Sequence, residues 1–464
     1  MRRLSVLLAA TCLAGCSLQA PYVQPPLPVP SSWPAGDPYL RQSEAELPAI
    51  NYRDVFTDAR LQQLIDQALV NNRDLRVAAA NILAARAQYR IQRAAQVPQI
   101  DLGGRYAHTG GKGGTAPDAY SVDLGITAFE IDLFGRLQSL SDAALNRYFA
   151  TEEAARSTRL ILVADVAEAW LTYAADESLL RIASQTAANA ERSVQLTNAR
   201  LRGGVAPRTD LRQAETILAT AQADVAALRT AVAQDLNALQ LLLGSPVDKA
   251  LLPSSIDQAS AGLATLPAGL QSSVLLRRPD VMQAEYGLRA ANAEIGAARA
   301  ALFPTISLTG ALGYATGSLA SLFTDGAFTY SVAPRVDYPI FRAGAGLAGV
   351  AQSRAQRDAA LAAYEKAIQT AFRETSDALA RQGTIADELA ARRTQVAAAD
   401  DTFRLTEARY RGGVDTFLAS LVSQRSLYSA QQSLVATQLA AAINRVTLYR
   451  VLGGDAGLES PSSP

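Results

Sequence analysis

The sequence of 464 residues predicts a mixed fold, in which strands of a transmembrane β-barrel and very long α-helices form two tandem structural repeats. Three markers occur once in each half, in the same order and at nearly the same spacing. They are Pro-x-Ile-x-Leu at 98 and 304, Tyr-Ser-Val at 120 and 330, and Arg-Gly-Gly-Val at 202 and 411. Solenoid repeats are much shorter, roughly 20–50 residues. We therefore expect two copies of one large substructure around an axis where a channel could lie.

The first residues predict export and lipid attachment. A basic start and a short apolar run over residues 4–14 are typical of a secretory signal peptide, which we place at residues 1–15. The run ends in Leu-Ala-Gly-Cys at 13–16, which resembles the lipobox of bacterial lipoproteins. By that resemblance Cys16 is the first mature residue and carries S-diacylglycerol and N-palmitoyl lipid. The alternative is an ordinary signal peptide with a chance cysteine.

Composition excludes several classes of protein. The 43 basic and 43 acidic residues cancel, so no overall field would attract nucleic acid. The only other cysteine, Cys12, lies in the signal, which excludes disulfides within the mature chain and thiolate metal cages. Beyond the signal no apolar run approaches the roughly 18–20 residues of a membrane helix. If the chain crosses a membrane, it must do so as strands.

Proline and glycine placement divides the chain. Eight of the 20 prolines fall between Pro21 and Pro48, so residues 16–57 are expected to form an extended, lipid-linked tether. Residues 136–202 contain neither glycine nor proline, which predicts one helix about 100 Å long. The glycine pair at 203–204 ends this helix, and a second helix returns over 207–243. The second copy repeats this hairpin with helices at 346–411 and 416–452 around the glycine pair at 412–413.

The predicted segments follow in order along the chain. Shorter helices are expected at 58–70, 74–95 and 280–302. Helical repeat 1, with the linker into repeat 2, occupies 58–97 and 136–298, and the strands of repeat 1 lie in 98–135. The strands of repeat 2 lie in 299–343, and helical repeat 2 occupies 344–452. A disordered tail is expected at 453–464.

Four segments alternate between apolar and polar residues. They begin near Ile100, Tyr120, Ile306 and Tyr330, and the second is expected to alternate as far as Ala128. Alternation over about ten residues with aromatic ends is typical of membrane β-barrel strands. The alternative is a soluble sheet with one wet face, but charges at lumen positions, namely Asp123, Arg335 and Asp337, favour a barrel. Pro334 cannot donate to a strand ladder, so it should lie at an edge or a bulge.

Four strands cannot close a barrel, because known barrels have at least about eight. An open edge in lipid would leave backbone groups unpaired, so the chain must oligomerise. A heterologous interface that closes gives a ring. Two copies would give eight strands and three would give twelve, and strand counting does not decide between them.

Three motifs together resemble one family. They are Phe-Glu-Ile-Asp-Leu-Phe-Gly at 129–135, Leu-Arg-Arg-Pro-Asp-Val at 276–281 and Tyr-Arg-Gly-Gly-Val-Asp at 410–415. The chain resembles a TolC-type outer-membrane factor of the lipoprotein branch that serves RND drug-efflux pumps. The resemblance implies a homotrimer with four strands per protomer in a 12-strand barrel, continued by a long α-helical barrel across the periplasm.

The resemblance also implies a location and partners. The protein would be lipid-anchored in the bacterial outer membrane and would span it, with a long periplasmic part. Its partners would be outer-membrane lipid, a periplasmic adaptor (membrane fusion) protein and an inner-membrane RND pump. No nucleic acid and no cofactor besides the lipid on Cys16 are expected.

The resemblance also assigns candidate functional residues at the tips of the two helical hairpins. The tips would contact the adaptor, with plain helix capping as the alternative; they comprise Gly203, Gly204, Val205, Gly412, Gly413 and Val414. A periplasmic gate would be formed by Leu418, Val422 and Asp415. The family often has an aspartate where this chain has Val422, so two stacked apolar rings could close the pore by excluding water. Asp415 is expected to cap its helix rather than to close the gate.

The predicted function is that of an exit duct for drugs or other small toxic compounds. Two alternatives keep the duct but assign it to type I protein secretion or metal export, and a third is a non-conducting coiled-coil envelope lipoprotein. No enzymatic activity is expected. The sole histidine, His108, should lie in a surface loop, and Lys112 in a glycine-rich stretch is not followed by the helix of a phosphate loop. Glu130 and Asp132 suit a structural or pore-rim role.

Overall fold

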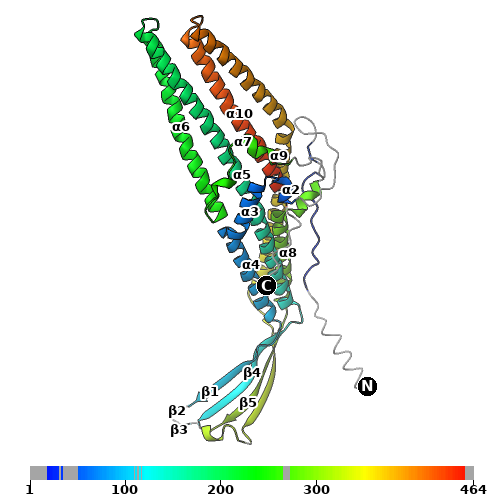
Figure 1. Cartoon of the computed structure of the whole chain (residues 1–464). Helices are drawn as coiled ribbons and strands as arrows, with labels where there is room; N and C mark the ends of the chain where they lie inside the picture. The colour runs from blue at the N-terminus through cyan, green and yellow to red at the C-terminus, as the bar shows by residue number, and fades with distance from the viewer. Residues whose placement is uncertain are drawn as a thin grey trace. The chain divides into compact units, whose positions relative to one another are not determined.

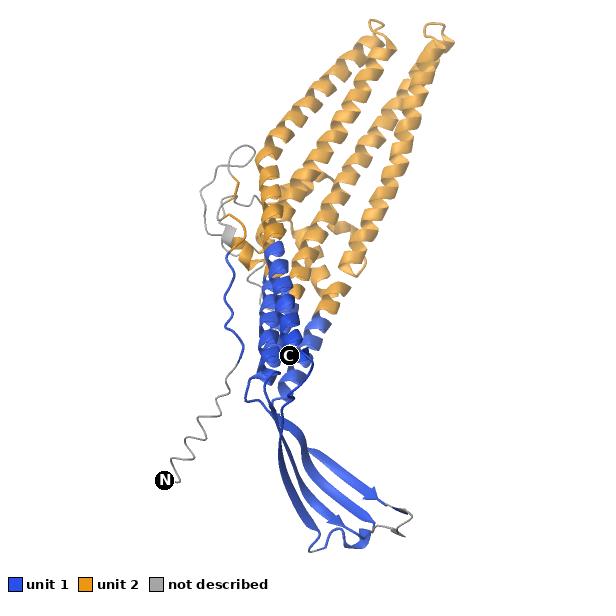
Figure 2. Cartoon of the chain, turned by 180° about the vertical axis from the view of Figure 1, so that it is seen from behind, with its two compact units in different colours: residues 1–26, 79–153, 282–367 blue, residues 27–78, 154–281, 368–464 orange. Residues whose placement is uncertain are grey.

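The computed structural model describes residues 18–30, 33–34, 51–108, 110–111, 114–115, 118–264, 272–324 and 326–454. Cys16, Lys112 and residues 455–464 of the predicted tail lie outside these ranges. Gly453 and Gly454, the first two residues of that predicted disordered tail, are instead buried in a turn. The chain forms two compact units (Figure 2). Unit 1 comprises residues 1–26, 79–153 and 282–367, and unit 2 comprises residues 27–78, 154–281 and 368–464.

Unit 1 contains a four-stranded antiparallel sheet in the order β1-β4-β5-β6 (Figure 1). The strands are β1 (Asp101–Ala107), β4 (Ala119–Ile131), β5 (Thr305–Thr316) and β6 (Phe328–Asp337). The four predicted strands are therefore confirmed. The sequence did not indicate the small pair β2 (Gly110–Gly111) and β3 (Gly114–Thr115), which lies between β1 and β4 along the chain, or the short 3-10 helix η3 (Leu319–Ser321).

One expectation for β4 is wrong. Its alternation does not continue through Ala128, because Thr127 and Ala128 together oppose the single residue Thr309 in a β-bulge. Ala128 takes a positive φ of 49°, and its N–H donates to Thr309 Oγ1 at 3.1 Å. The apolar face therefore resumes at Phe129. β6 has no bulge, and Pro334 lies on this edge strand of the sheet, as expected for a residue without an N–H.

A structural role for Glu130 and Asp132 is confirmed at the start of α5 (Arg136–Arg202). Asp132 accepts from the backbone N–H of Arg136 at 2.6 Å and of Gln138 at 2.8 Å, which satisfies free donors of the first helical turn. Glu130 accepts from Arg136 Nε at 2.7 Å. The two carboxylates thus fix the corner where strand becomes helix.

The remaining helices are α2 (Tyr52–Val55), α3 (Ala59–Asn71), α4 (Arg73–Ala94), α6 (Arg208–Leu243), α7 (Ile256–Ala261), α8 (Pro279–Ala300), α9 (Ala345–Arg411) and α10 (Phe417–Val451), with 3-10 helices η1 (Lys249–Leu251) and η2 (Ser272–Arg277). Of these, α3, α4, α6, α8, α9 and α10 match the predicted helices, whereas α2, α7 and the two 3-10 helices were not predicted. α2 also contradicts the expectation that residues 16–57 are extended throughout, because Asn51 caps a short helix there. α9 is continuous through Gly383, where the sequence suggested a softer segment. Within the described residues, no helix combines the length and apolarity needed to cross a membrane.

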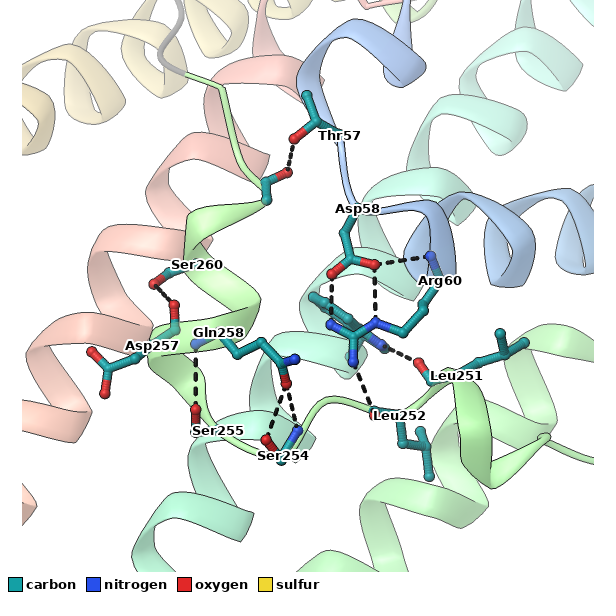
Figure 3. A network of polar contacts seen from close by, with 12 residues as sticks. Thr57, Asp58, Arg60, Leu251, Leu252, Ser254, Ser255, Asp257, Gln258 and Ser260 are labelled. Atoms are coloured by element: carbon teal, nitrogen blue, oxygen red, sulfur yellow. Dashed lines mark hydrogen bonds and ion pairs between the residues drawn. The ribbon is translucent and has the colours of Figure 1, made fainter.

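The core of unit 2 lies where α3, α5, α6, α7 and α10 meet around the fully buried Trp170. The indole Nε1 donates to the Leu251 carbonyl at 3.0 Å. Nearby, Asp58 caps α3 and pairs with Arg60, whose guanidinium also reaches the Leu252 carbonyl (Figure 3). These polar contacts attach the connector after α6 to α3, so the base of the hairpins is held by both apolar and polar groups.

The Leu-Arg-Arg-Pro-Asp-Val motif supplies a second anchor in unit 2. Arg278 is 7% exposed and donates to Asp280 Oδ2 at 2.8 Å and to Glu374 Oε2 at 2.9 Å. Its Nη1 also donates to the Val451 carbonyl at 3.2 Å, at the end of α10. One buried guanidinium therefore joins α8, α9 and α10.

Candidate functional site: channel wall, helical tips and gate

The two faces of the sheet differ in chemistry. One face carries small and charged residues, and Asp123 lies there between its register partners Gly103 and Gly313. The pairing also places Arg335 and Asp337 on this face, as expected for lumen residues. The other face is apolar and exposed; it includes Leu102, Leu124, Leu312, Tyr330, Val332 and Val336. An exposed apolar face opposite a polar one is typical of a barrel wall in a membrane.

Aromatic side chains lie at both ends of this apolar face. Tyr106 and Tyr120 stack with ring centroids 4.9 Å apart near the β1–β4 connection. At the opposite end, where strands join helices, Phe134 and Phe303 stack at 4.7 Å. Aromatic girdles at both membrane interfaces accompany barrel strands. The sheet edges β1 and β6 have no strand partner within the described chain, so a closed wall requires further copies.

The two predicted tips have matching backbone geometry. At the first, Gly204 takes φ +76° and the Val205 N–H donates to the Arg200 carbonyl at 3.0 Å. At the second, Gly413 takes φ +74° and the Val414 N–H donates to the Arg409 carbonyl at 2.9 Å. A left-handed glycine with this bond pattern is the Schellman ending of a helix. Capping therefore explains Gly204 and Gly413.

Capping does not explain the valines that follow the glycines. Val205 is 76% exposed and Val414 is 67% exposed. Each tip thus presents an apolar side chain to solvent next to a fixed turn.

Asp415 does not cap α10, so that expectation is wrong. The helix begins at Phe417, and the hydroxyl of Thr416 accepts from the Ala419 N–H. Thr416 holds the cap position because its backbone is extended directly before the first helical residue. Asp415 instead accepts from Arg409 Nε at 2.7 Å, and this guanidinium lowers the pKa of the carboxyl.

Arg200 is the counterpart of Arg409 in the first copy but has a different partner. Ala206 replaces the aspartate there, so Arg200 has no acid in its own turn. Its guanidinium lies 4.5 Å from the centroid of the Tyr410 ring and donates to the Tyr410 carbonyl at 3.3 Å and to the Arg411 carbonyl at 3.1 Å. A cation at the last carbonyls of a helix is favourable. Arg200 therefore holds the two tips together.

The proposed gate residues Leu418 and Val422 lie one turn apart on α10 and are 54% and 53% exposed. They border a groove of about 880 Å³ between α6 and α10, together with Thr216, Thr220 and Arg425. Leu421, between them in sequence, is instead buried against Tyr410 and Phe417. The predicted shared face of Leu418 and Val422 is confirmed; their closing of a pore stays a prediction.

A second contact joins the hairpins farther along the same groove. Tyr428 of α10 donates its hydroxyl to Asp224 Oδ2 of α6 at 2.9 Å. Burial, together with this bond to a carboxylate, raises the pKa of Tyr428 to about 12, so it stays a neutral donor. Sequence reasoning missed both hairpin contacts. One signal was available for Arg200: the two tips repeat each other, but Ala206 stands where the second tip has Asp415. Arg200 therefore had to find a partner outside its own turn.

The sole histidine lies on the surface beside a carboxylate. His108 is exposed after β1, and its Nδ1 lies 2.6 Å from Asp118 Oδ1. The described residues contain no group of three or more His, Cys, Asp or Glu side chains that could hold a metal ion.

The sequence model of the family described as "Outer membrane efflux protein" matches residues 64–245 and 270–454. The probable efflux pump outer membrane protein TtgC of Pseudomonas putida is 44% identical over 462 residues, covering 97% of this chain and 95% of the relative. The solvent efflux pump outer membrane protein SrpC of Pseudomonas putida is 42% identical over 463 residues, covering 96% and 97%. The open state of the Neisseria gonorrhoeae MtrE outer membrane channel superposes with a TM-score of 0.86 at 35% identity, covering 95% and 98%.

The fold is that of these channels, in which three chains contribute four strands each to a twelve-stranded barrel that continues into a helical barrel. Together with the exposed apolar wall, the open sheet edges and the paired helical tips, this likeness identifies the chain as a member of the outer membrane efflux protein family and as an outer-membrane efflux channel.

Proposed function

We propose that the trimer is the exit duct of a tripartite pump that expels drugs, solvents or other small toxic compounds. A periplasmic adaptor protein would join it to an inner-membrane RND pump. The observation that carries this proposal is one chain combining an exposed apolar sheet with long hairpins that end in two matching turns. The relatives named as solvent and efflux pump components support the class of cargo.

The adaptor would engage the six exposed tips of the trimer. Each Schellman turn fixes its backbone, so binding Val205 or Val414 would cost little conformational entropy. A cysteine introduced at either position should crosslink to a cysteine at the tip of the adaptor's helical hairpin. Crosslinking only from positions in the middle of the helices would contradict tip-to-tip contact.

The resting duct would be closed at the tips by rings of Leu418 and Val422 around the axis. Apolar rings close a narrow pore by excluding water. The Arg200 and Tyr428 contacts would hold the hairpins in the closed arrangement. Opening would separate the hairpins when adaptor and pump bind, so both contacts would break or rearrange.

Lipid on Cys16 would anchor each chain in the outer membrane. The described chain begins at Leu18, whose carbonyl accepts from Arg299 Nη1 at 3.3 Å close to the start of β5. Only Ser17 separates Cys16 from Leu18, so the lipid would stay near the strand–helix junction. Radiolabelled palmitate should enter the wild-type protein but not Cys16→Ser, which should also yield fewer trimers. Absence of label in the wild type would refute lipid attachment.

The duct is tested in two steps. Purified trimers in planar lipid bilayers should give discrete channels, and expression in a strain lacking its own outer channel should restore resistance to toxic organic compounds when adaptor and pump are present. Channels without any restored resistance would favour protein secretion or metal export. A protein that forms no channels would contradict the duct itself.

A further inference from the structure

A cavity of about 290 Å³ lies within unit 1, between an N-terminal strap (residues 18–26) and the helices α8 and α9. Pro21 and Val23 of the strap form one apolar wall, and Leu288 and Ile295 of α8 form another. Liquid water occupies roughly 30 Å³ per molecule, so the space could hold a phosphate with a glycerol unit.

The strap is held in place by specific contacts. Asn292 Nδ2 donates to the Ala20 carbonyl at 3.0 Å. The Tyr22 hydroxyl donates to Glu285 Oε1 at 3.3 Å, and the Arg289 guanidinium lies 4.9 Å from the Tyr22 ring centroid. These side chains of α8 fix the position of the strap, so the strap forms a defined wall of the cavity.

Three arginines give the cavity a strong positive charge. Arg299 of α8 and Arg354 and Arg357 of α9 line it, and its lining includes no carboxylate. Arg357 Nε lies 3.3 Å from Asp358 Oδ1, whereas neither Arg299 nor Arg354 forms an ion pair within the described part of the chain. Guanidinium groups bind phosphate oxygens through paired N–H donors, and several of them around one site favour an anion with several oxygens.

The cavity also lies close to the membrane-facing sheet of the same unit. Arg299 is in the last turn of α8, which ends at Ala300, and β5 begins at Thr305. The cavity therefore begins just below the strands, at the depth where the phosphates of the periplasmic leaflet would be found.

We propose that this cavity binds the phosphate group of an anionic phospholipid from the periplasmic leaflet. The phosphate would lie against Arg299, Arg354 and Arg357, and the glycerol against the apolar walls. The acyl chains would remain in the bilayer, because the cavity is too small for them. This inference rests on the placement of the protein in the outer membrane but not on its transport activity. It assigns the strap a second role besides tethering: it completes a lipid site.

Detergent-solubilised wild-type trimers are mixed with phosphatidylglycerol or phosphatidylcholine and studied by native mass spectrometry. The expected result is preferential retention of phosphatidylglycerol, up to one molecule per protomer. Replacing Arg354 and Arg357 together by glutamine should lower this retention by about tenfold or more, because two charge-assisted contacts to the phosphate are lost. The matched control replaces Arg373 and Arg404, which are exposed elsewhere on α9, and should retain the lipid.

Competition separates the two sources of phosphate. Glycerol phosphate or inorganic phosphate that displaces the lipid at equal concentration would show a site for small soluble anions and overturn the lipid assignment. Equal loss of lipid in the control variant, or equal retention of both lipids, would also overturn it. Trimer content and single-channel conductance are measured on the same samples. Unchanged values show that a change in lipid retention does not arise from loss of the fold or of the duct.

Discussion

Removing the Arg200 side chain should open the resting channel, whereas removing its repeat counterpart Arg409 should not. Arg200 crosses from the first hairpin to the end of α9, where it contacts two carbonyls and the Tyr410 ring. Arg409 pairs with Asp415 within its own turn. Arg200→Ala therefore removes a contact between hairpins, and Arg409→Ala removes one within a hairpin.

The expected change in the open fraction of the channel follows from the two contacts of Arg200. A cation at a helix C-terminus contributes about 0.3–1 kcal/mol, and an exposed cation–π contact about 0.5–1 kcal/mol. The closed state thus loses about 1–2 kcal/mol per protomer in Arg200→Ala. If the three protomers open together the loss is about 3–6 kcal/mol, and each 1.4 kcal/mol changes an equilibrium tenfold. Even if the contact in one protomer controls opening, the open fraction should therefore rise about five- to thirtyfold.

Single-channel recording in planar bilayers measures the open fraction directly, and sensitivity of cells to vancomycin reports the same leak. Arg409→Ala should stay near the wild type in both assays, because its ion pair is present whether the hairpins are together or apart. Similar opening in both variants would show a general loosening of the tips. No opening in Arg200→Ala would refute the idea that this arginine holds the closed state.

Three further predictions concern the gate and the stability of unit 2. Leu418→Ala combined with Val422→Ser should raise resting conductance several-fold, and an unchanged current would exclude these residues as the constriction. Burial and the neighbouring Asp176 raise the pKa of Asp235 to about 6, so its folded form binds a proton more readily than its unfolded form. The contribution of Asp235 to stability is therefore present at low pH and lost as pH rises through about 6. Asp235→Asn should raise the melting temperature at pH 7.5 and weaken the dependence of the melting temperature on pH. A lower melting temperature of the variant at pH 7.5 would contradict this reasoning. Arg278→Met should lower the free energy of unfolding by about 3 kcal/mol, because two carboxylates and a carbonyl lose a shared partner, and unchanged thermal melting would show that the cluster contributes little.

Local sequence signals were sufficient to predict the long helices, the hairpin tips and the strands. The stretch without glycine or proline before Gly203 marked α5, and the matching glycine pairs marked both tips, because helix propensity and capping depend on neighbouring residues. The strands were equally visible, since alternation follows from the pleat itself. These features need no knowledge of distant contacts.

Contacts between distant residues were not predictable in the same way. The bulge at Ala128 depends on Thr309, which lies in the other repeat and supplies the hydroxyl that accepts the extra N–H. Asp415 and Thr416 both suit a helix cap by composition, but Thr416 takes the cap position and Asp415 pairs with Arg409 instead. The partner of Arg200 is set by the packing of two hairpins, for which a single sequence gives no register.

The bulge in β4 also affects the symmetry of the assembled wall. β4 carries an extra residue in its pairing with β5, whereas β6, the second strand of the other repeat, pairs with the opposite edge of β5 without one. A bulge bends its strand and increases the local twist. In a closed ring of three chains this bend recurs three times, once in every chain. The barrel cross-section should have three corners near Ala128, and its curvature should be concentrated there.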